Sequence, residues 1–204
     1  MFRNAFQKLE IEEATPILSE VNAAIEGSPF AGESISVLAQ DLPFYAGYRF
    51  LEVSDHAAQP VRVQYIVYKP GDVVPLNWTN EPIYNLNEKA PIALSNDNVG
   101  LYAKFFFTYV RGRHGRFLIA ESVDDIDWRD DPPPAARKAV GAMLTPVTIT
   151  DVAVDGTYNL IAQMMFKDSL FKSAIHVKTD GTVSLSDEEL LIEDMPVLDD
   201  TLGL

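Results

Sequence analysis

The chain has 204 residues, of which 47% are hydrophobic and none is cysteine, so it can fill a core but cannot form disulfides or cysteine-based zinc sites. Its 30 acidic and 16 basic residues give a formal charge of −14, which repels a phosphate backbone and argues against nucleic-acid binding. No apolar run approaches the ~20 residues that span a bilayer and no secretion signal is visible, so we predict a soluble, cytoplasmic protein without membrane association.

Residues 2–26 are predicted to be helical in two pieces that are separated at Thr15-Pro16. Threonine would cap the second piece, and proline would take its first position, where a missing N–H costs nothing. The second piece carries an apolar stripe, which is typical of a helix that packs on a sheet. This stripe consists of Ile17, Leu18, Val21, Ala24 and Ile25. Gly27 and Pro29 would stop the helix.

The apolar period changes to two from about Tyr48, which indicates strands rather than helix. We predict a strand pair over Tyr48–Val53 and Val61–Tyr68. The stretch from Lys69 to Pro91 contains four prolines, and we expect an irregular excursion there.

A helix is predicted over Asn98–Arg111, because large apolar residues recur there at three- and four-residue spacing. A strand is the competing interpretation, since Phe105-Phe106-Phe107 has high β propensity. Gly112 and Gly115 would end the helix, and a strand over Phe117–Ser122 would follow. The run Pro132-Pro133-Pro134 then leads into a short amphipathic helix.

The last part of the chain is predicted to be a four-strand antiparallel meander. Its strands lie near Val147–Val154, Thr157–Phe166, Leu170–Lys178 and Thr182–Ser186. Asp155-Gly156 and Asp180-Gly181 indicate type I′ hairpin turns. The expected core face comprises Tyr158, Leu160, Ala162, Met164, Phe166, Phe171, Ser173, Ile175 and Val177.

These elements predict an α+β fold in which an antiparallel sheet, ending in the meander, packs against an N-terminal and a mid-chain helix. We expect one domain over residues 1–186. Residues 187–204 form an acidic, partly apolar tail, which we expect to dock on its own domain or on a partner.

The densest positive cluster runs from Arg111 to Arg116 and contains Arg113 and His114. It could bind an anion, and His114 is a weak candidate for a catalytic proton acceptor. The alternative is a basic helix end that complements the helix dipole and the acidic loop Asp124–Asp131.

A second candidate is the segment Trp78–Glu88, which mixes aromatic and amide side chains in an expected loop. Its candidate ligand-binding residues are Trp78, Asn80, Tyr84 and Asn87, to which Arg111 and Arg113 are added from the positive cluster. The alternative is that Trp78 and Tyr84 only pin this loop to the core.

No metal or cofactor is expected. The acidic loop lacks the spacing of a calcium loop, and His56, His114 and His176 are dispersed rather than at zinc-binding spacing. No Gly-x-Ser-x-Gly motif occurs, although convergence of distant residues in space is left open.

The sequence does not identify a function. We favour a non-enzymatic binding or protein-interaction domain that uses the Trp78–Glu88 segment or the acidic tail against a protein partner. The alternative is a small-molecule ligand-binding protein or enzyme, with a pocket between sheet and helix that has His114 and the nearby arginines at its mouth. An acidic surface that mimics nucleic acid is a third possibility, and the oligomeric state is left open.

Overall fold

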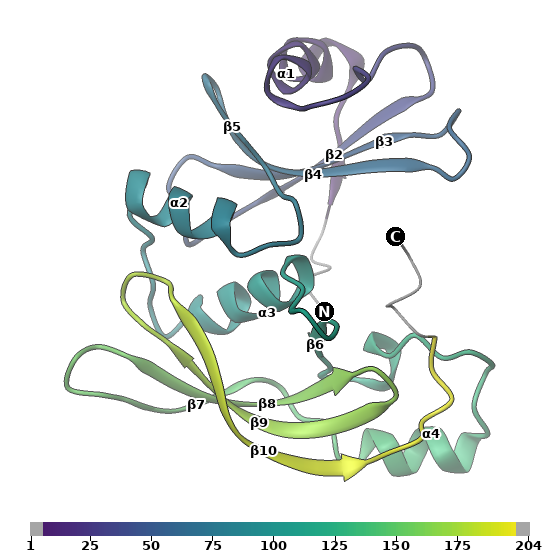
Figure 1. The fold of residues 1–204 in the computed structure, drawn as a ribbon, viewed down its shortest axis with the longest axis vertical. Coiled ribbons are helices and arrows are strands. Elements are labelled where there is room, and N and C mark those ends of the chain that lie inside the picture. The colour runs from purple at the N-terminus through teal and green to yellow at the C-terminus, as the bar shows by residue number, and fades with distance from the viewer. Residues whose placement is uncertain (1–5, 199–204) are drawn as a thin grey trace. The chain divides into compact units, whose positions relative to one another are not determined.

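A computed structural model describes residues 6–198 and divides the chain into two compact units. The N-terminal unit comprises residues 6–77 and 81–93, and the C-terminal unit comprises residues 78–80 and 94–198. Each unit contains an antiparallel sheet of five strands (Figure 1). The α+β class is therefore confirmed. Whether both units form the one domain predicted for residues 1–186 stays a prediction.

The N-terminal unit begins with β1 (Gln7–Lys8) and α1 (Ile11–Ala24). A meander follows, with β2 (Ile35–Asp41), β3 (Arg49–Asp55), β4 (Arg62–Lys69) and β5 (Asp72–Pro75), and α2 (Glu81–Lys89) ends the unit. The strand order is β1-β2-β3-β4-β5. The predicted pair β3 and β4 is confirmed, whereas β2 was not foreseen.

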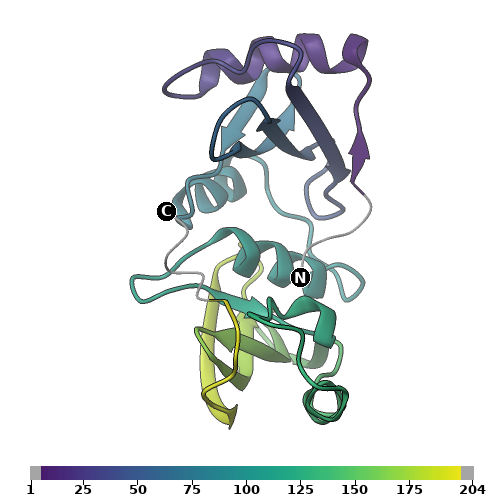
Figure 2. The same cartoon turned by 90° about the vertical axis from the view of Figure 1, so that its right-hand side faces the viewer.

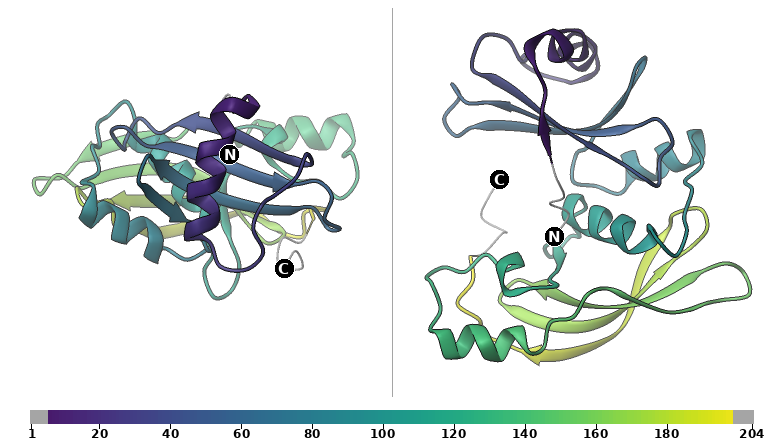
Figure 3. Two further views of the ribbon diagram at one scale, coloured as in Figure 1. Left: turned by 90° about the horizontal axis from the view of Figure 1, so that it is seen from above. Right: turned by 180° about the vertical axis from the view of Figure 1, so that it is seen from behind.

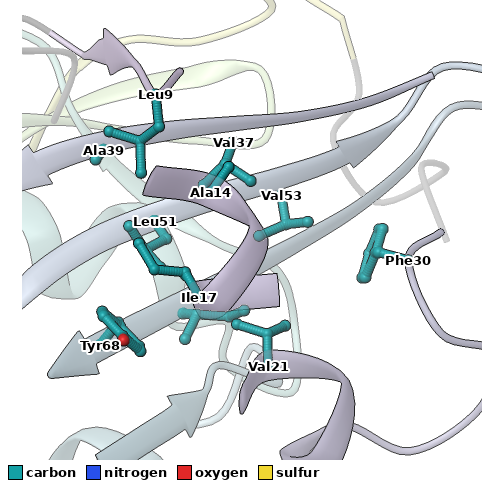
Figure 4. Close-up of a cluster of buried hydrophobic side chains, with 11 residues drawn as sticks. Leu9, Ala14, Ile17, Val21, Phe30, Val37, Ala39, Leu51, Val53 and Tyr68 are labelled. Atoms are coloured by element: carbon teal, nitrogen blue, oxygen red, sulfur yellow. The ribbon is translucent and has the colours of Figure 1, made fainter. Parts of the chain in front are cut away.

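Helix α1 lies across the strands of this sheet (Figure 3). Ile17 and Val21 are buried against Leu51, Val53 and their neighbours in one apolar cluster (Figure 4). The predicted division of the helix at Thr15-Pro16 is wrong, because α1 is continuous and holds Pro16 inside it. Burial of the apolar stripe on both sides of the proline outweighs the lost backbone hydrogen bond.

Helix α2 corrects the prediction of an irregular excursion over Lys69–Pro91. Its buried residues, Ile83, Leu86 and Asn87, occur at three- and four-residue spacing that the prolines obscured. Lys89 Nζ lies 2.5 Å from Asp72 Oδ1, and Tyr48 donates to Asp72 Oδ2 at 2.5 Å. Burial and the neighbouring Asp72 carboxylate raise the pKa of Tyr48 to about 12.

The C-terminal unit begins with α3 (Val99–Tyr109), β6 (Phe117–Ile119), a short 3₁₀ helix (Val123–Asp125) and α4 (Pro134–Gly141). Four strands follow, namely β7 (Thr148–Val152), β8 (Tyr158–Phe166), β9 (Ser169–Val177) and β10 (Val183–Ile192). The order is β10-β9-β8, and β6 and β7 both pair with the other side of β8. The predicted helix over Asn98–Arg111 and the meander are confirmed.

The two faces of the C-terminal sheet are covered differently. Helix α3 and helix α4 lie on opposite faces (Figures 1 and 2). On the α4 face, Val140 and Leu144 pack with Met165 and Leu170 at one end of β8 and β9. No described helix is long and apolar enough to cross a membrane.

The predicted type I′ turns are wrong. Within each Asp-Gly pair only the glycine has positive φ, 85° at Gly156 and 80° at Gly181. The Gly156 N–H donates to Ala153 O, and Asp155 Oδ1 accepts from Thr157 N. The aspartate therefore binds the backbone ahead of it and stays at negative φ, so the loop is one residue longer than predicted.

The predicted tail is partly regular structure. Strand β10 continues through residues 187–192 past a bulge, and Met195 and Val197 are buried beside α4. Val197 forms an isolated bridge with Trp128. Residues 199–204 lie outside the described part of the chain.

Candidate functional site

The predicted positive cluster forms a tight turn in which Gly112 and Gly115 pair. The Arg111 guanidinium lies 4.2 Å from the centre of the Trp78 ring, and that of Arg116 lies 5.9 Å from it. The Arg111 N–H also donates to Trp78 O at 2.7 Å. The fold thus brings Trp78 and Arg111 together, as cation–π partners that anchor the turn.

Arg113 and His114 are exposed at the tip of this turn. The hollow beside its base, lined by Gly115, Arg116 and Leu118, has a volume of about 40 Å³. Neither Arg113 nor His114 lines this hollow, so a role for them in binding stays a prediction.

The remaining ligand-binding candidates are divided between the two units of the chain. Asn87 is buried in α2, where its Oδ1 accepts from the Tyr45 hydroxyl at 2.5 Å. Tyr84 is half-buried on the same helix, and Asn80 is exposed just before it. Asn87 therefore has a structural partner, and the aromatic-amide segment is not one open loop.

A larger hollow lies in the N-terminal unit, between α1 and β2, and has a volume of about 580 Å³. We call it the α1–β2 groove. Its apolar walls come from Leu9, Ala14, Leu18, Phe30 and Ile35. Glu10 and Glu33 are exposed on its rim. Such a size is ordinary for a ligand-binding cleft.

One wall of the groove is held in place by polar contacts. The Asn22 amide accepts from Phe30 N at 2.7 Å and donates to Phe30 O at 2.9 Å. The Arg62 guanidinium lies 3.9 Å from the Phe30 ring centre. These contacts fix the loop between α1 and β2, so the groove is preformed.

The open edge of β2 borders this groove. Strand β1 pairs only with Leu38 and Ala39, and Leu9 N donates to Val37 O just beyond. Ser34 O instead accepts from His56 N on the opposite side of β2. Because backbone groups alternate along a strand, the N–H and C=O of Ile35 point to the outer edge. Within residues 6–198 they have no partner.

The C-terminal unit holds a row of hydrogen-bonded side chains across β7 to β10. His176 Nδ1 lies 2.6 Å from Asn159 Oδ1, and His176 Nε2 lies 2.7 Å from Ser186 Oγ. Asn159 Nδ2 donates to Asp151 Oδ2 at 2.8 Å. Ser186 Oγ also lies 3.0 Å from Asp187 Oδ2. We call this set the His176 row.

The His176 row lies on the α4 face, at the end that α4 leaves uncovered. Asn159 and Met165 share this face, because they are an even number of residues apart on β8. Only Met165 belongs to the cluster beneath α4, whereas Asn159, His176 and Ser186 are half-buried. The row is therefore ordered but accessible from solvent.

A second serine–histidine pair lies in the N-terminal unit. Ser36 Oγ is 2.9 Å from His56 Nε2, in a hollow of about 440 Å³ that Glu33 and Glu52 also line. Among the described residues, no hydrogen-bond partner faces His56 Nδ1. This ring is consequently oriented from one side only.

Sequence reasoning named His176 but missed Ser186, Asn159 and Asp151. The signal was the hairpin register: the two turns of the meander place Asn159 and Ser184 opposite His176. The bulge in β10 and the diagonal bond to Ser186 follow only from the three-dimensional structure.

Among the described residues no three His, Asp or Glu side chains are grouped to hold a metal ion. No protein-family model, curated protein or solved structure matches this chain.

Proposed function

We propose that this protein is a protein-interaction module that binds an extended segment of a partner as an added strand. The segment would lie in the α1–β2 groove and pair with the open edge of β2. The observation that carries this proposal is the outward-facing N–H and C=O of Ile35 beside a preformed apolar groove. Strand addition of this kind takes affinity from the main chain and specificity from pockets for alternate side chains.

The chemistry of the groove defines the partner segment. Every second side chain of an added strand would point to the apolar wall formed by Leu18 and Phe30, so we expect apolar residues at alternate positions. Glu10 and Glu33 on the rim outnumber Lys8, and a basic residue at one end of the segment would complement them. The occupant is thus an extended apolar peptide with a basic flank.

The test uses a displayed library of random twelve-residue peptides that is panned on the full chain, followed by affinity measurements. Ile35→Pro removes the outward N–H but leaves the pairing with β3 intact, because that N–H does not face β3. We expect it to weaken binding of the selected peptides about fivefold, since one main-chain hydrogen bond is worth roughly 1 kcal/mol. Ile35→Val keeps the N–H and should change affinity less than threefold.

Ser36→Pro is the matched control for strand orientation. The Ser36 N–H faces β3, so its loss should lower the melting temperature more than Ile35→Pro does, which loses only the packing of the half-buried Ile35 side chain. Selected peptides that bind Ile35→Pro as tightly as the unmodified chain would refute strand addition. Selection of peptides without apolar residues at alternate positions would refute the groove as their site.

A further inference from the structure

The His176 row has the order of groups that nucleophilic active sites use: a hydroxyl, an imidazole within hydrogen-bond reach, and a third group that orients the ring. We propose that Ser186 is a nucleophile that accepts an acyl group from small neutral esters, with His176 as its general base. This activity belongs to the C-terminal unit and does not depend on strand addition in the N-terminal unit.

The hydrogen bonds of the row fix the tautomer of His176. The Asp151 carboxylate only accepts, so the Asn159 amide must turn its Nδ2 toward Asp151 and its Oδ1 toward the ring. Because Oδ1 also only accepts, His176 Nδ1 carries the hydrogen. In the neutral ring, Nε2 is then the acceptor that faces Ser186 Oγ, which is the arrangement a general base requires.

The proposed step is balanced as follows. Ser186 Oγ attacks the ester carbonyl carbon while its proton moves to His176 Nε2. The bond from that carbon to the leaving oxygen then breaks, and the leaving group takes the proton from Nε2, or departs as an anion while Nε2 releases its proton to solvent. Water, deprotonated by the neutral ring, can hydrolyse the acyl-serine by the reverse sequence and restore the hydroxyl.

The surroundings of Ser186 define the substrate class. In the strand register Ala174 lies opposite Ser186 and Ile161 lies opposite Ala174, so a small half-buried apolar patch adjoins the hydroxyl. Asp187 is exposed beside it and Asp151 ends the row, so a negatively charged substrate would be repelled. The face is open rather than deep. We therefore expect short-chain neutral esters.

The probe is p-nitrophenyl acetate, applied to the full chain, with p-nitrophenol release and peptide mass mapping as readouts. Ser184 is the control within the same molecule, because it lies opposite His176 in the register, is exposed, and makes no hydrogen bond to the ring. General-base assistance is worth roughly a hundredfold. We expect Ser186 to acetylate about a hundredfold faster than Ser184, or p-nitrophenol release that Ser186→Ala abolishes and Ser184→Ala leaves unchanged.

The dependence of the acetylation rate on pH distinguishes a catalytic row from a merely structural one. If His176 is the general base, the rate of Ser186 acetylation should rise as His176 loses its proton, and His176→Gln should abolish that rise. Asn159→Ala should slow acetylation about tenfold while esters still reach Ser186, since Asn159 is a positioning residue. Acetylation of Ser186 no faster than that of Ser184 in the unmodified, folded chain overturns the proposal. So does a pH profile that is unchanged in His176→Gln.

Discussion

The two sheets are both antiparallel meanders that carry a helix on at least one face, yet they leave different parts of their structure open. The N-terminal sheet leaves an edge open, where the backbone of Ile35 borders the α1–β2 groove. The outer strand β10 of the C-terminal sheet is interrupted by a bulge and carries acids, while the His176 row on the α4 face lies outside the cluster beneath α4. Open backbone suits recognition of another chain, whereas an ordered row of side chains suits chemistry.

The two serine–histidine pairs also differ between the units, in how the histidine ring is held. Their hydrogen bonds are similar in length, 2.9 Å for Ser36–His56 and 2.7 Å for Ser186–His176. His56 lies at a turn, with a strand on one side of it, whereas His176 lies between two strands that supply Asn159 and Ser186. A central strand therefore orients its ring from both sides, and a turn does not.

The largest expected effect is on the free energy of unfolding, and it tests whether the two sheets unfold separately. Leu51→Ala in β3 and Leu160→Ala in β8 each truncate a side chain that is at most 1% exposed. Each should cost about 3 kcal/mol, from lost apolar burial and the cavity left behind. If the chain is one cooperative domain, as predicted from the sequence, urea unfolding shows one transition that both variants shift. Two transitions, each shifted by one variant alone, would contradict that prediction.

A smaller effect concerns the ion pair that ties α3 to the C-terminal sheet. Lys104 Nζ lies 2.8 Å from Glu121 Oε2, and Val147 N donates to Glu121 Oε1 at 2.9 Å. Burial raises the pKa of Glu121, but these hydrogen bonds outweigh it and hold the pKa below the ordinary 4.5. The stabilisation is therefore present above that value and is lost as pH falls through the lower folded-state pKa.

Glu121→Gln should accordingly destabilise the protein by about 1 to 2 kcal/mol at pH 7, allowing for partial exposure of the pair. The difference from the unmodified chain should shrink as the pH falls below 4, which denaturation at several pH values measures. Asp124→Asn is the control, because its carboxylate is 81% exposed and its pairing with Arg137 should contribute little. Equal effects of the two substitutions would contradict the assigned role of Glu121.

The smallest effect concerns Asp187, which competes with His176 for the Ser186 hydrogen. Asp187 has φ 51°, and asparagine tolerates this backbone conformation. Asp187→Asn removes a negative charge near Ser186, where the carbonyl oxygen of the ester would become anionic during the attack. Acetylation of Ser186 should therefore rise about two- to fivefold, the size of one screened charge at this range. A slower rate would show that the Asp187 carboxylate assists the serine.

The sequence by itself determined the α+β class, the meander and the mid-chain helix α3. Periodic apolar residues and Asp-Gly turns are local signals, and burial of Leu160, Ile175 and Val177 follows from strand alternation alone. Predictions from local signals were wrong where long-range packing determined the structure. Proline could not divide α1, because Ala14 and Val21 are buried on either side of it.

Only the tertiary structure decided the candidate sites. Asp151 and Ser186 are separated in sequence by 35 positions, and they join one row because three hairpins set the register of four strands. The α1–β2 groove likewise requires α1 to dock on a sheet whose first strand ends early. Side-chain rows and open edges depend on which strands become neighbours, and periodicity within a single strand carries no record of that pairing.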